Sequence, residues 1–150
     1  MPTLKPDAPP YQSNFRAYML APQDVPASTS DVIIFNAKWF DGKGEYDDTT
    51  TYRFTAKKAG EYLVMASAEF RGTVANVPIA LDIYLNTDFE LSHQTAYMDT
   101  SVDDTVSISG LVSMEAGDYL EARLSNGGGT GTVTIVDSSD ITFFAEHRLS

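Results

Sequence analysis

Apolar and polar residues alternate along most of the chain from Phe15 onward. The segment VPIALDIYLN (77–86) is the clearest case, because every second residue from Ile79 to Leu85 is Ile or Leu. A period of two is that of a β-strand with one buried face. About ten such segments occur, separated by turn-forming residues roughly every 8 to 12 positions. They are the ranges 15–20, 31–35, 52–56, 60–71, 77–86, 89–98, 105–114, 119–126, 132–136 and 140–147.

This spacing predicts an all-β protein, with no helix anywhere. Many short strands joined by turns favour an antiparallel two-sheet sandwich of the jelly-roll type. The chain has no internal repeat of 20 to 50 residues, which argues against propellers and solenoids. We expect one jelly-roll domain over residues 15–150.

Glycines mark several of the predicted turns. Gly60 precedes a strand and Gly117 lies between two strands, so we expect both to need positive φ. The run Gly127–Gly131 is neither followed by Lys-Ser/Thr nor placed before a helix, which excludes a phosphate loop. We expect this run to be a flexible, exposed hairpin tip.

The first 14 residues differ from the rest. They contain four of the seven prolines and cannot form a helix or a central strand, so residues 1–14 are predicted to be an extended arm. A loose terminus is one interpretation; an arm that docks on another protein is the other. The docking candidates are Pro2, Leu4, Pro6, Pro9, Pro10 and Tyr11.

Charge and composition exclude several classes of protein. Ten Lys and Arg against 21 Asp and Glu give a net charge of −11, which disfavours binding to nucleic acid or to anionic membranes. The absence of cysteine excludes disulfides and thiolate chemistry. No signal-peptide pattern or membrane-spanning run is present, so we expect synthesis in a host cytoplasm without export by the usual route.

Residues suited to catalysis are scarce. The two histidines, His93 and His147, show no spacing typical of a hydrolytic triad or a zinc site. The pairs Asp47-Asp48 and Asp103-Asp104 offer oxygens suited to Ca²⁺, but solvated turns explain them better in so acidic a chain. We therefore expect no enzyme activity, cofactor or metal.

Aromatics and turn residues between positions 35 and 62 form a spaced set. This set resembles the signature of the complement subcomponent q globular domain, within the tumour necrosis factor-like jelly rolls. The residues that carry it are Phe35, Asp41, Tyr46, Phe54, Gly60 and Tyr62. The resemblance extends over roughly residues 15–149, and the chain is similar to a divergent viral or bacterial member.

The resemblance implies a compact homotrimer built around a three-fold axis. The predicted strands leave some apolar residues outside one sandwich core, and surplus apolar surface is typical of an interface. The candidates for subunit contact are Leu63, Met65, Ala80 and Tyr84.

Three functional hypotheses follow. The first is a structural protein of the virion, a trimeric phage capsid decoration protein that attaches to the major capsid protein through its arm. The alternative is the receptor- or glycan-binding tip of a phage fibre or bacterial surface protein, with exposed aromatics in its apical loops. A secreted complement-like ligand comes third, because it requires a leader sequence.

Overall fold

The structure is a computed structural model that describes residues 11–150, apart from the side chains of Phe89 and Ser92. Twelve strands form in this range, all paired antiparallel and arranged in two sheets. The strands are β1 (Asn14–Tyr18), β2 (Gln23–Val25), β3 (Thr29–Val32), β4 (Ala37–Asp41), β5 (Phe54–Thr55), β6 (Gly60–Gly72), β7 (Pro78–Leu85), β8 (Phe89–Tyr97), β9 (Asp104–Met114), β10 (Tyr119–Asn126), β11 (Val133–Ile135) and β12 (Phe143–Arg148).

The larger sheet, called here the β6 sheet, is built on the 13-residue strand β6. Strand β9 pairs with one edge of β6 along 11 successive residues. The other edge pairs with β12 and, beyond it, with β11. Strands β1 and β4 extend the sheet from β12, and β2 extends it from β11.

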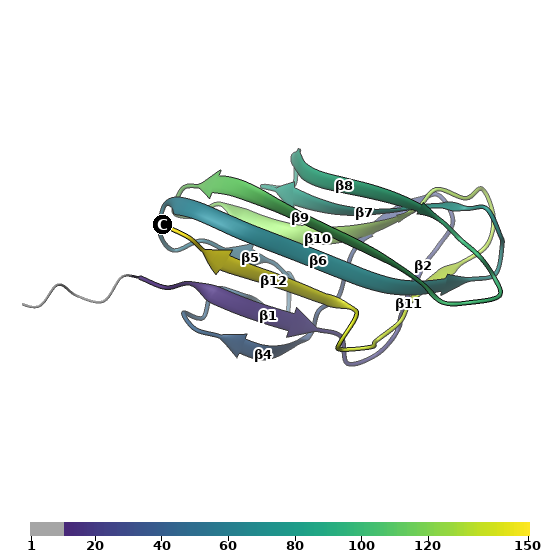
Figure 1. Cartoon of the computed structure of the whole chain (residues 1–150), viewed down its shortest axis with the longest axis horizontal. Helices are drawn as coiled ribbons and strands as arrows, with labels where there is room; N and C mark the ends of the chain where they lie inside the picture. The colour runs from purple at the N-terminus through teal and green to yellow at the C-terminus, as the bar shows by residue number, and fades with distance from the viewer. Residues whose placement is uncertain (1–10) are drawn as a thin grey trace, which may run out of the picture.

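The smaller sheet, called here the β7 sheet, contains β10, β7 and β8 in that order, with β5 and β3 one after the other along the outer edge of β10. After β6 the chain crosses to this sheet for β7 and β8, returns for β9, crosses again for β10 and returns for β11 and β12. This alternation between facing sheets is the jelly-roll connection. Figure 1 shows the two layers and the long antiparallel pairing of β6 with β9.

The core fills the space between the sheets with the residues that the period of two places inward. On β6 these are Tyr62, Val64, Ala66, Ala68 and Phe70, all at most 1% exposed. At the end where β1 begins, the Phe15 ring stacks on Tyr46 at 4.6 Å and on Phe54 at 5.4 Å, and meets Phe144 edge-on at 5.2 Å. Buried aromatics of this size stabilise the contact between the sheets.

The predicted two-sheet antiparallel sandwich is confirmed, and two short strands were missed. Strand β2 lies between the predicted strands at 15–20 and 31–35, and β4 lies between those at 31–35 and 52–56. Both are too short for a period of two to stand out. The strand expected at 31–35 ends at Val32, although Ile33 and Phe35 are buried.

The two glycines expected at positive φ are required for different reasons. Gly117 has φ +98°, as predicted, in the turn between β9 and β10. Gly60 does not have positive φ, so that expectation was wrong. Glycine is required there because a Cβ would lie 2.2 Å from the carbonyl oxygen of Ser150 and 2.7 Å from Arg148 Nε.

The segment 127–132 is not a hairpin tip, because β10 and β11 belong to different sheets. Its first residues are also not free, since Gly127 N donates to Pro78 O at 2.9 Å and Gly128 is buried. Asn126 Nδ2 holds the crossing by donating to Val25 O and Gly131 O. The segment is thus an anchored connection between the sheets.

Shortening a buried leucine should destabilise the fold far more than shortening an exposed one. Leu124→Ala should lower the free energy of unfolding by about 2–5 kcal/mol, because it leaves a cavity between the sheets. The matched control is Leu149→Ala, whose side chain is 55% exposed and should change stability by less than about 0.5 kcal/mol. Urea unfolding followed by fluorescence measures both, and equal losses would contradict this packing.

Candidate interaction face

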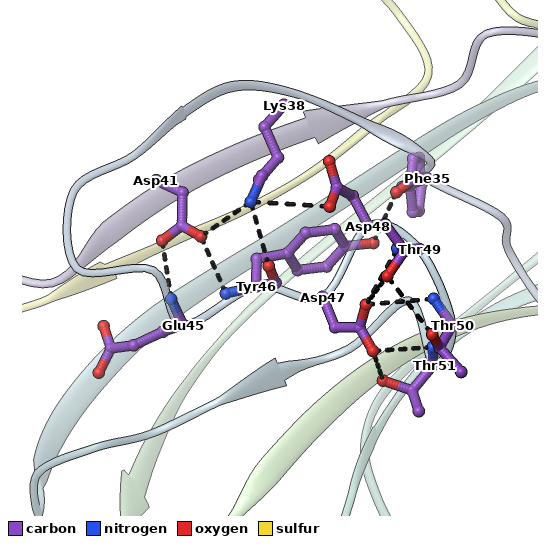
Figure 2. Close-up of polar contacts among 10 residues, drawn as sticks. All are labelled: Phe35, Lys38, Asp41, Glu45, Tyr46, Asp47, Asp48, Thr49, Thr50 and Thr51. Atoms are coloured by element: carbon purple, nitrogen blue, oxygen red, sulfur yellow. Dashed lines mark hydrogen bonds and ion pairs between the residues drawn. The ribbon is translucent and has the colours of Figure 1, made fainter.

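The loop between β4 and β5 fixes the outer edge of the β6 sheet. Asp41, at the end of β4, accepts hydrogen bonds from Glu45 N at 2.9 Å and Tyr46 N at 3.1 Å. Lys38 Nζ lies 3.4 Å from Asp41 Oδ2 and 3.7 Å from Asp48 Oδ1. Figure 2 shows how these side chains close the loop onto the strand.

Tyr46 ties the same loop to the core. Its hydroxyl donates to Phe35 O at 3.1 Å and its ring is buried against Phe15. Burial is the main reason why the pKa of Tyr46 is raised well above its usual value, so the hydroxyl stays a donor. The spaced residues Phe35, Asp41 and Tyr46 therefore act together as one structural unit.

The paired aspartates considered for Ca²⁺ have structural partners. Asp47 accepts hydrogen bonds from the backbone of Thr49, Thr50 and Thr51, visible in Figure 2, and those from Thr49 are the first cause of its lowered pKa. Asp103 forms an ion pair with Arg71 at 2.8 Å. These contacts agree with solvated turns.

The outer side of the β6 sheet forms a candidate interaction face. The strand register aligns its residues in three rows that run across β1, β12, β6 and β9. They are Asn14–His147–Leu63–Leu111, Arg16–Ala145–Met65–Ser109 and Tyr18–Phe143–Ser67–Ser107. We call these rows, together with Trp39 and Phe40 of β4, the outer face.

The outer face exposes several large apolar side chains and holds no carboxylate in its three rows, which Glu61 and Glu69 flank at the next outward positions of β6. Leu111 is 64% exposed, Phe40 49%, Trp39 47% and Met65 36%. None of the residues named in the rows is Asp or Glu, although the chain contains 21 acidic residues. A face that exposes large apolar side chains without negative charge is typical of a contact surface.

Small residues make the outer face uneven. Ala145, Ser107 and Ser109 surround Met65 and leave a hollow of about 330 Å³ on one side of it and of about 270 Å³ on the other. The larger hollow is bounded by Phe40 and Phe143. The exposed Met65 side chain can insert into a partner surface, and the hollows beside it can receive a side chain from that surface.

Arg16 contributes its aromatic contacts to this surface. Its guanidinium carbon lies 4.4 Å from the ring centre of Trp39 and 4.4 Å from that of Phe143. Contacts of this kind are favourable and spread the positive charge over two rings. The one Arg of the rows is therefore held flat within the aromatic surface.

The four residues predicted for subunit contact lie on two different sheets. Leu63 and Met65 are on the outer face, whereas Ala80 and Tyr84 are on the outside of the β7 sheet. There Tyr84 lies under Arg123 at 5.1 Å, close to the charged Glu121. The structure does not bring Leu63 and Met65 together with Ala80 and Tyr84. Subunit contact stays a prediction for all four residues.

Sequence reasoning missed Leu111, Trp39 and Phe40. A signal existed for Leu111, because it is the one large apolar residue on the polar side of the predicted strand 105–114. Trp39 and Phe40 are adjacent aromatics in a strand that was not predicted. Their place beside the rows depends on the pairing of β4 with β1.

The last residues of the predicted arm, Tyr11 to Asn14, are built into the domain, and the candidates Pro2, Leu4, Pro6, Pro9 and Pro10 lie outside the described residues. The Tyr11 hydroxyl donates to Glu45 Oε1 at 2.7 Å, and Arg148 Nη1 donates to Tyr11 O at 3.1 Å. Burial, followed by the contact with Glu45, raises the pKa of Tyr11. These contacts fix where the arm leaves the jelly roll.

Ser13 lies between two buried carboxyl groups, Glu45 and Glu146. Its Oγ contacts Glu45 Oε2 and lies 3.1 Å from Glu146 Oε2. The Ser13 hydroxyl is the donor toward both carboxyl groups and so links them through a single oxygen. Burial raises the pKa of Glu146 to about 8, so this carboxyl group is protonated at neutral pH.

Comparisons with known proteins agree in the fold. Murine APRIL superposes with a TM-score of 0.71 at 10% identity, over 93% of this chain and 100% of that one. The globular domain of zebrafish complement 1qA protein superposes with a TM-score of 0.68 at 16% identity, over 93% of this chain and 98% of that one. Eiger TNF from S. frugiperda superposes with a TM-score of 0.66 at 13% identity, over 93% of this chain and 92% of that one.

The protein has the tumour necrosis factor/complement C1q jelly-roll fold. No protein-family model and no curated protein matches the sequence, so the likeness is one of structure at low identity. The tumour necrosis factor-like resemblance seen in the spaced aromatics is confirmed at the level of the fold.

In residues 11–150 no helix is long and apolar enough to span a membrane. The exposed apolar residues of the outer face are the feature that bears most directly on function.

Glu146 should make the stability of this jelly roll depend on pH. Its pKa is about 8 in the folded protein and near the ordinary glutamate value of 4.5 when unfolded, so the folded state holds the extra proton between these values. Stability should therefore fall as pH rises from 5 to 8 and level off above it. Glu146→Gln should remove this part of the pH dependence and stabilise the protein at pH 9.

The control is Glu115→Gln, since Glu115 is exposed in the turn after β9. Its unfolding free energy should follow the wild-type pH profile. Thermal unfolding at pH 5, 7 and 9 compares the three proteins. A Glu146→Gln profile parallel to that of the wild type would disprove the role of the buried carboxyl.

Proposed function

We propose that the protein is a homotrimeric, non-enzymatic structural protein that decorates a phage capsid. The trimer forms through the outer face of the β6 sheet, and the N-terminal arm attaches it to the major capsid protein. The observation that carries the proposal is an apolar, carboxylate-free face on a chain with a net charge of −11.

Charge supports self-association through this face. Copies of a chain with a charge of −11 repel one another wherever their acidic surfaces approach. The outer face is where Leu63, Met65 and Leu111 meet without a carboxylate among them. Contact between copies there buries apolar area while keeping the acidic groups at the periphery, where water screens them.

The shape of the face supports the same partner. Met65 projects between two hollows, and Phe40 and Phe143 border the larger one. Interfaces between copies of a chain are usually apolar at the centre and closely packed. A closed ring of three copies places each outer face against its neighbours, as in the homotrimers typical of this fold.

The anchored start of the arm supports attachment to a shell. Hydrogen bonds join Tyr11 and Ser13 to the domain through Glu45, Glu146 and Arg148. A partner that binds the arm is therefore connected firmly to the jelly roll. An extended proline-rich segment loses little conformational entropy when it docks, because proline already restricts the backbone. The residues proposed to dock on the shell are Pro2, Leu4, Pro6, Pro9, Pro10 and Tyr11. The proposed location of the protein is the virion.

A polar pocket favours the second candidate function, a receptor- or glycan-binding fibre tip. A pocket of about 410 Å³ lies at the far end of β6, lined by Thr73, Thr100, Ser101, Thr132 and Thr134 with Asp24, Arg71 and Asp103. Hydroxyl and carboxylate groups suit a sugar. No aromatic residue lines the pocket to stack on a sugar ring, so decoration is the first choice.

A charge placed in the outer face should dissociate the trimer. Leu111→Glu puts three carboxylates into the proposed contacts, and the sedimenting mass should fall from about three times 16.4 kDa to that of one chain. Val102→Glu is the matched control, because Val102 is similarly exposed at 56% but lies away from this face. Analytical ultracentrifugation at micromolar concentration measures both.

A wild-type protein that sediments as a monomer would refute the trimer. So would a Leu111→Glu variant with unchanged mass, because it would place the contact elsewhere. Circular dichroism of each variant separates loss of assembly from loss of folding.

Removing residues 1–10 should abolish attachment to the shell and leave the trimer intact. The truncated chain keeps Tyr11 and therefore the anchor with Glu45 and Arg148. Cosedimentation with undecorated shells of the virus that encodes the chain measures attachment. Undiminished binding would contradict the arm's role, and sugar-dependent binding lost in Arg71→Ala would favour the fibre tip instead.

A further inference from the structure

Three side chains with metal-binding groups converge on the outside of the β7 sheet. Asp82 of β7 lies directly opposite His93 of β8, and Glu90 approaches from three residues earlier on β8. His93 Nδ1 contacts Asp82 Oδ1 and lies 3.1 Å from Glu90 Oε1. One ligand atom from each residue lies within 4.8 Å of the others.

The burial of Asp82 points to a cation at this place. Its side chain is only 4% exposed, and within the described residues its one ion pair is with His93. Its second oxygen has a distant contact, with Ser125 Oγ at 3.5 Å. A buried carboxylate with so few donors is costly unless a cation compensates its charge.

The nearest arginine does not supply that charge. Arg123 stands opposite Asp82 on β10, but its Nε donates to Glu121 Oε1 at 3.0 Å and its guanidinium lies over Tyr84. Arg123 is thus committed to Glu121. Asp82 is left facing the imidazole ring and Glu90.

His93 is oriented as a ligand. Its Nε2 lies 2.9 Å from Thr95 Oγ1, and this contact turns Nδ1 towards the two carboxylates. Histidine ligands in metal sites commonly use their second ring nitrogen in this way. A lone pair on Nδ1 facing two carboxylates requires either a proton or a metal ion between them.

We propose that Asp82, Glu90 and His93 bind a zinc ion. Zinc takes nitrogen and oxygen ligands together at about 2.0–2.2 Å in tetrahedral sites, whereas Ca²⁺ and Mg²⁺ prefer oxygen alone. Asp82 is the fixed ligand, and the half-exposed side chains of His93 and Glu90 adjust around the ion. Water takes the fourth position on the solvent side.

The ion would join β8 to β7. Strand β8 pairs only with β7 within the β7 sheet, so it is an edge strand. Ligands from both strands cross-link this edge hairpin next to the irregular pairing at Ile83 and Tyr84. The site lies on the sheet opposite the outer face, so metal binding does not depend on the proposed trimer.

Zinc titration of the full-length protein tests the site. Isothermal titration with ZnCl₂ at pH 7.5 should show one ion per chain, and His93→Ala should weaken binding at least about tenfold. The chain has only one other histidine, so His147→Ala is the matched control and should bind zinc as the wild type does. Asp82→Asn should weaken binding to a similar extent.

Zinc should also raise the melting temperature of the wild type and of His147→Ala, but not that of His93→Ala. CaCl₂ should have no comparable effect. No zinc uptake by the wild type, or equal uptake by His93→Ala, would overturn the proposal. The same titration on Leu111→Glu separates the metal site from the trimer, because a monomer should bind one ion per chain too.

Discussion

The antiparallel pairing of β6 with three other strands is the constraint on which the rest of the structure depends. Along one edge β6 follows β9 for 11 residues, and along the other it meets β12 and then β11. Because side chains alternate along a strand, this register decides together which residues of all four strands face the core and which face outward. A slip of one residue would exchange the two sets.

The same register separates charge from apolar surface. Inward positions of β6 carry aromatic and small residues, and outward positions carry Leu63 and Met65, which β9 and β12 extend with Leu111 and Ala145. Further along β6 the outward positions are Glu61 and Glu69, which flank these apolar residues, whereas Glu45 and Glu146 are buried beside Ser13. The middle of the β6 sheet thus offers a surface without carboxylates, while the outside of the β7 sheet presents Asp82, Glu90 and Glu121.

The sequence contained enough to predict the sandwich, its inward faces and the exposure of Leu63 and Met65, because these depend on a local period of two. The remaining features depend on register between distant segments. Ser13 and Glu146, 133 positions apart, meet only when β1 pairs with β12. Likewise Asp82 and His93 look like ordinary polar residues until β7 and β8 align them. Short strands such as β4 give too few positions for any period to be recognised.

The two ends of the described chain lie together, since Arg148 N donates to Ser13 O and its guanidinium to Tyr11 O. In Figure 1 the C-terminus and the start of β1 lie at the same end of the sandwich. A circular permutation that joins these ends by a short linker and opens the chain in the exposed turn at 115–117 would keep every strand pair. Such a permuted domain would move the arm's attachment point without altering the jelly roll that carries it.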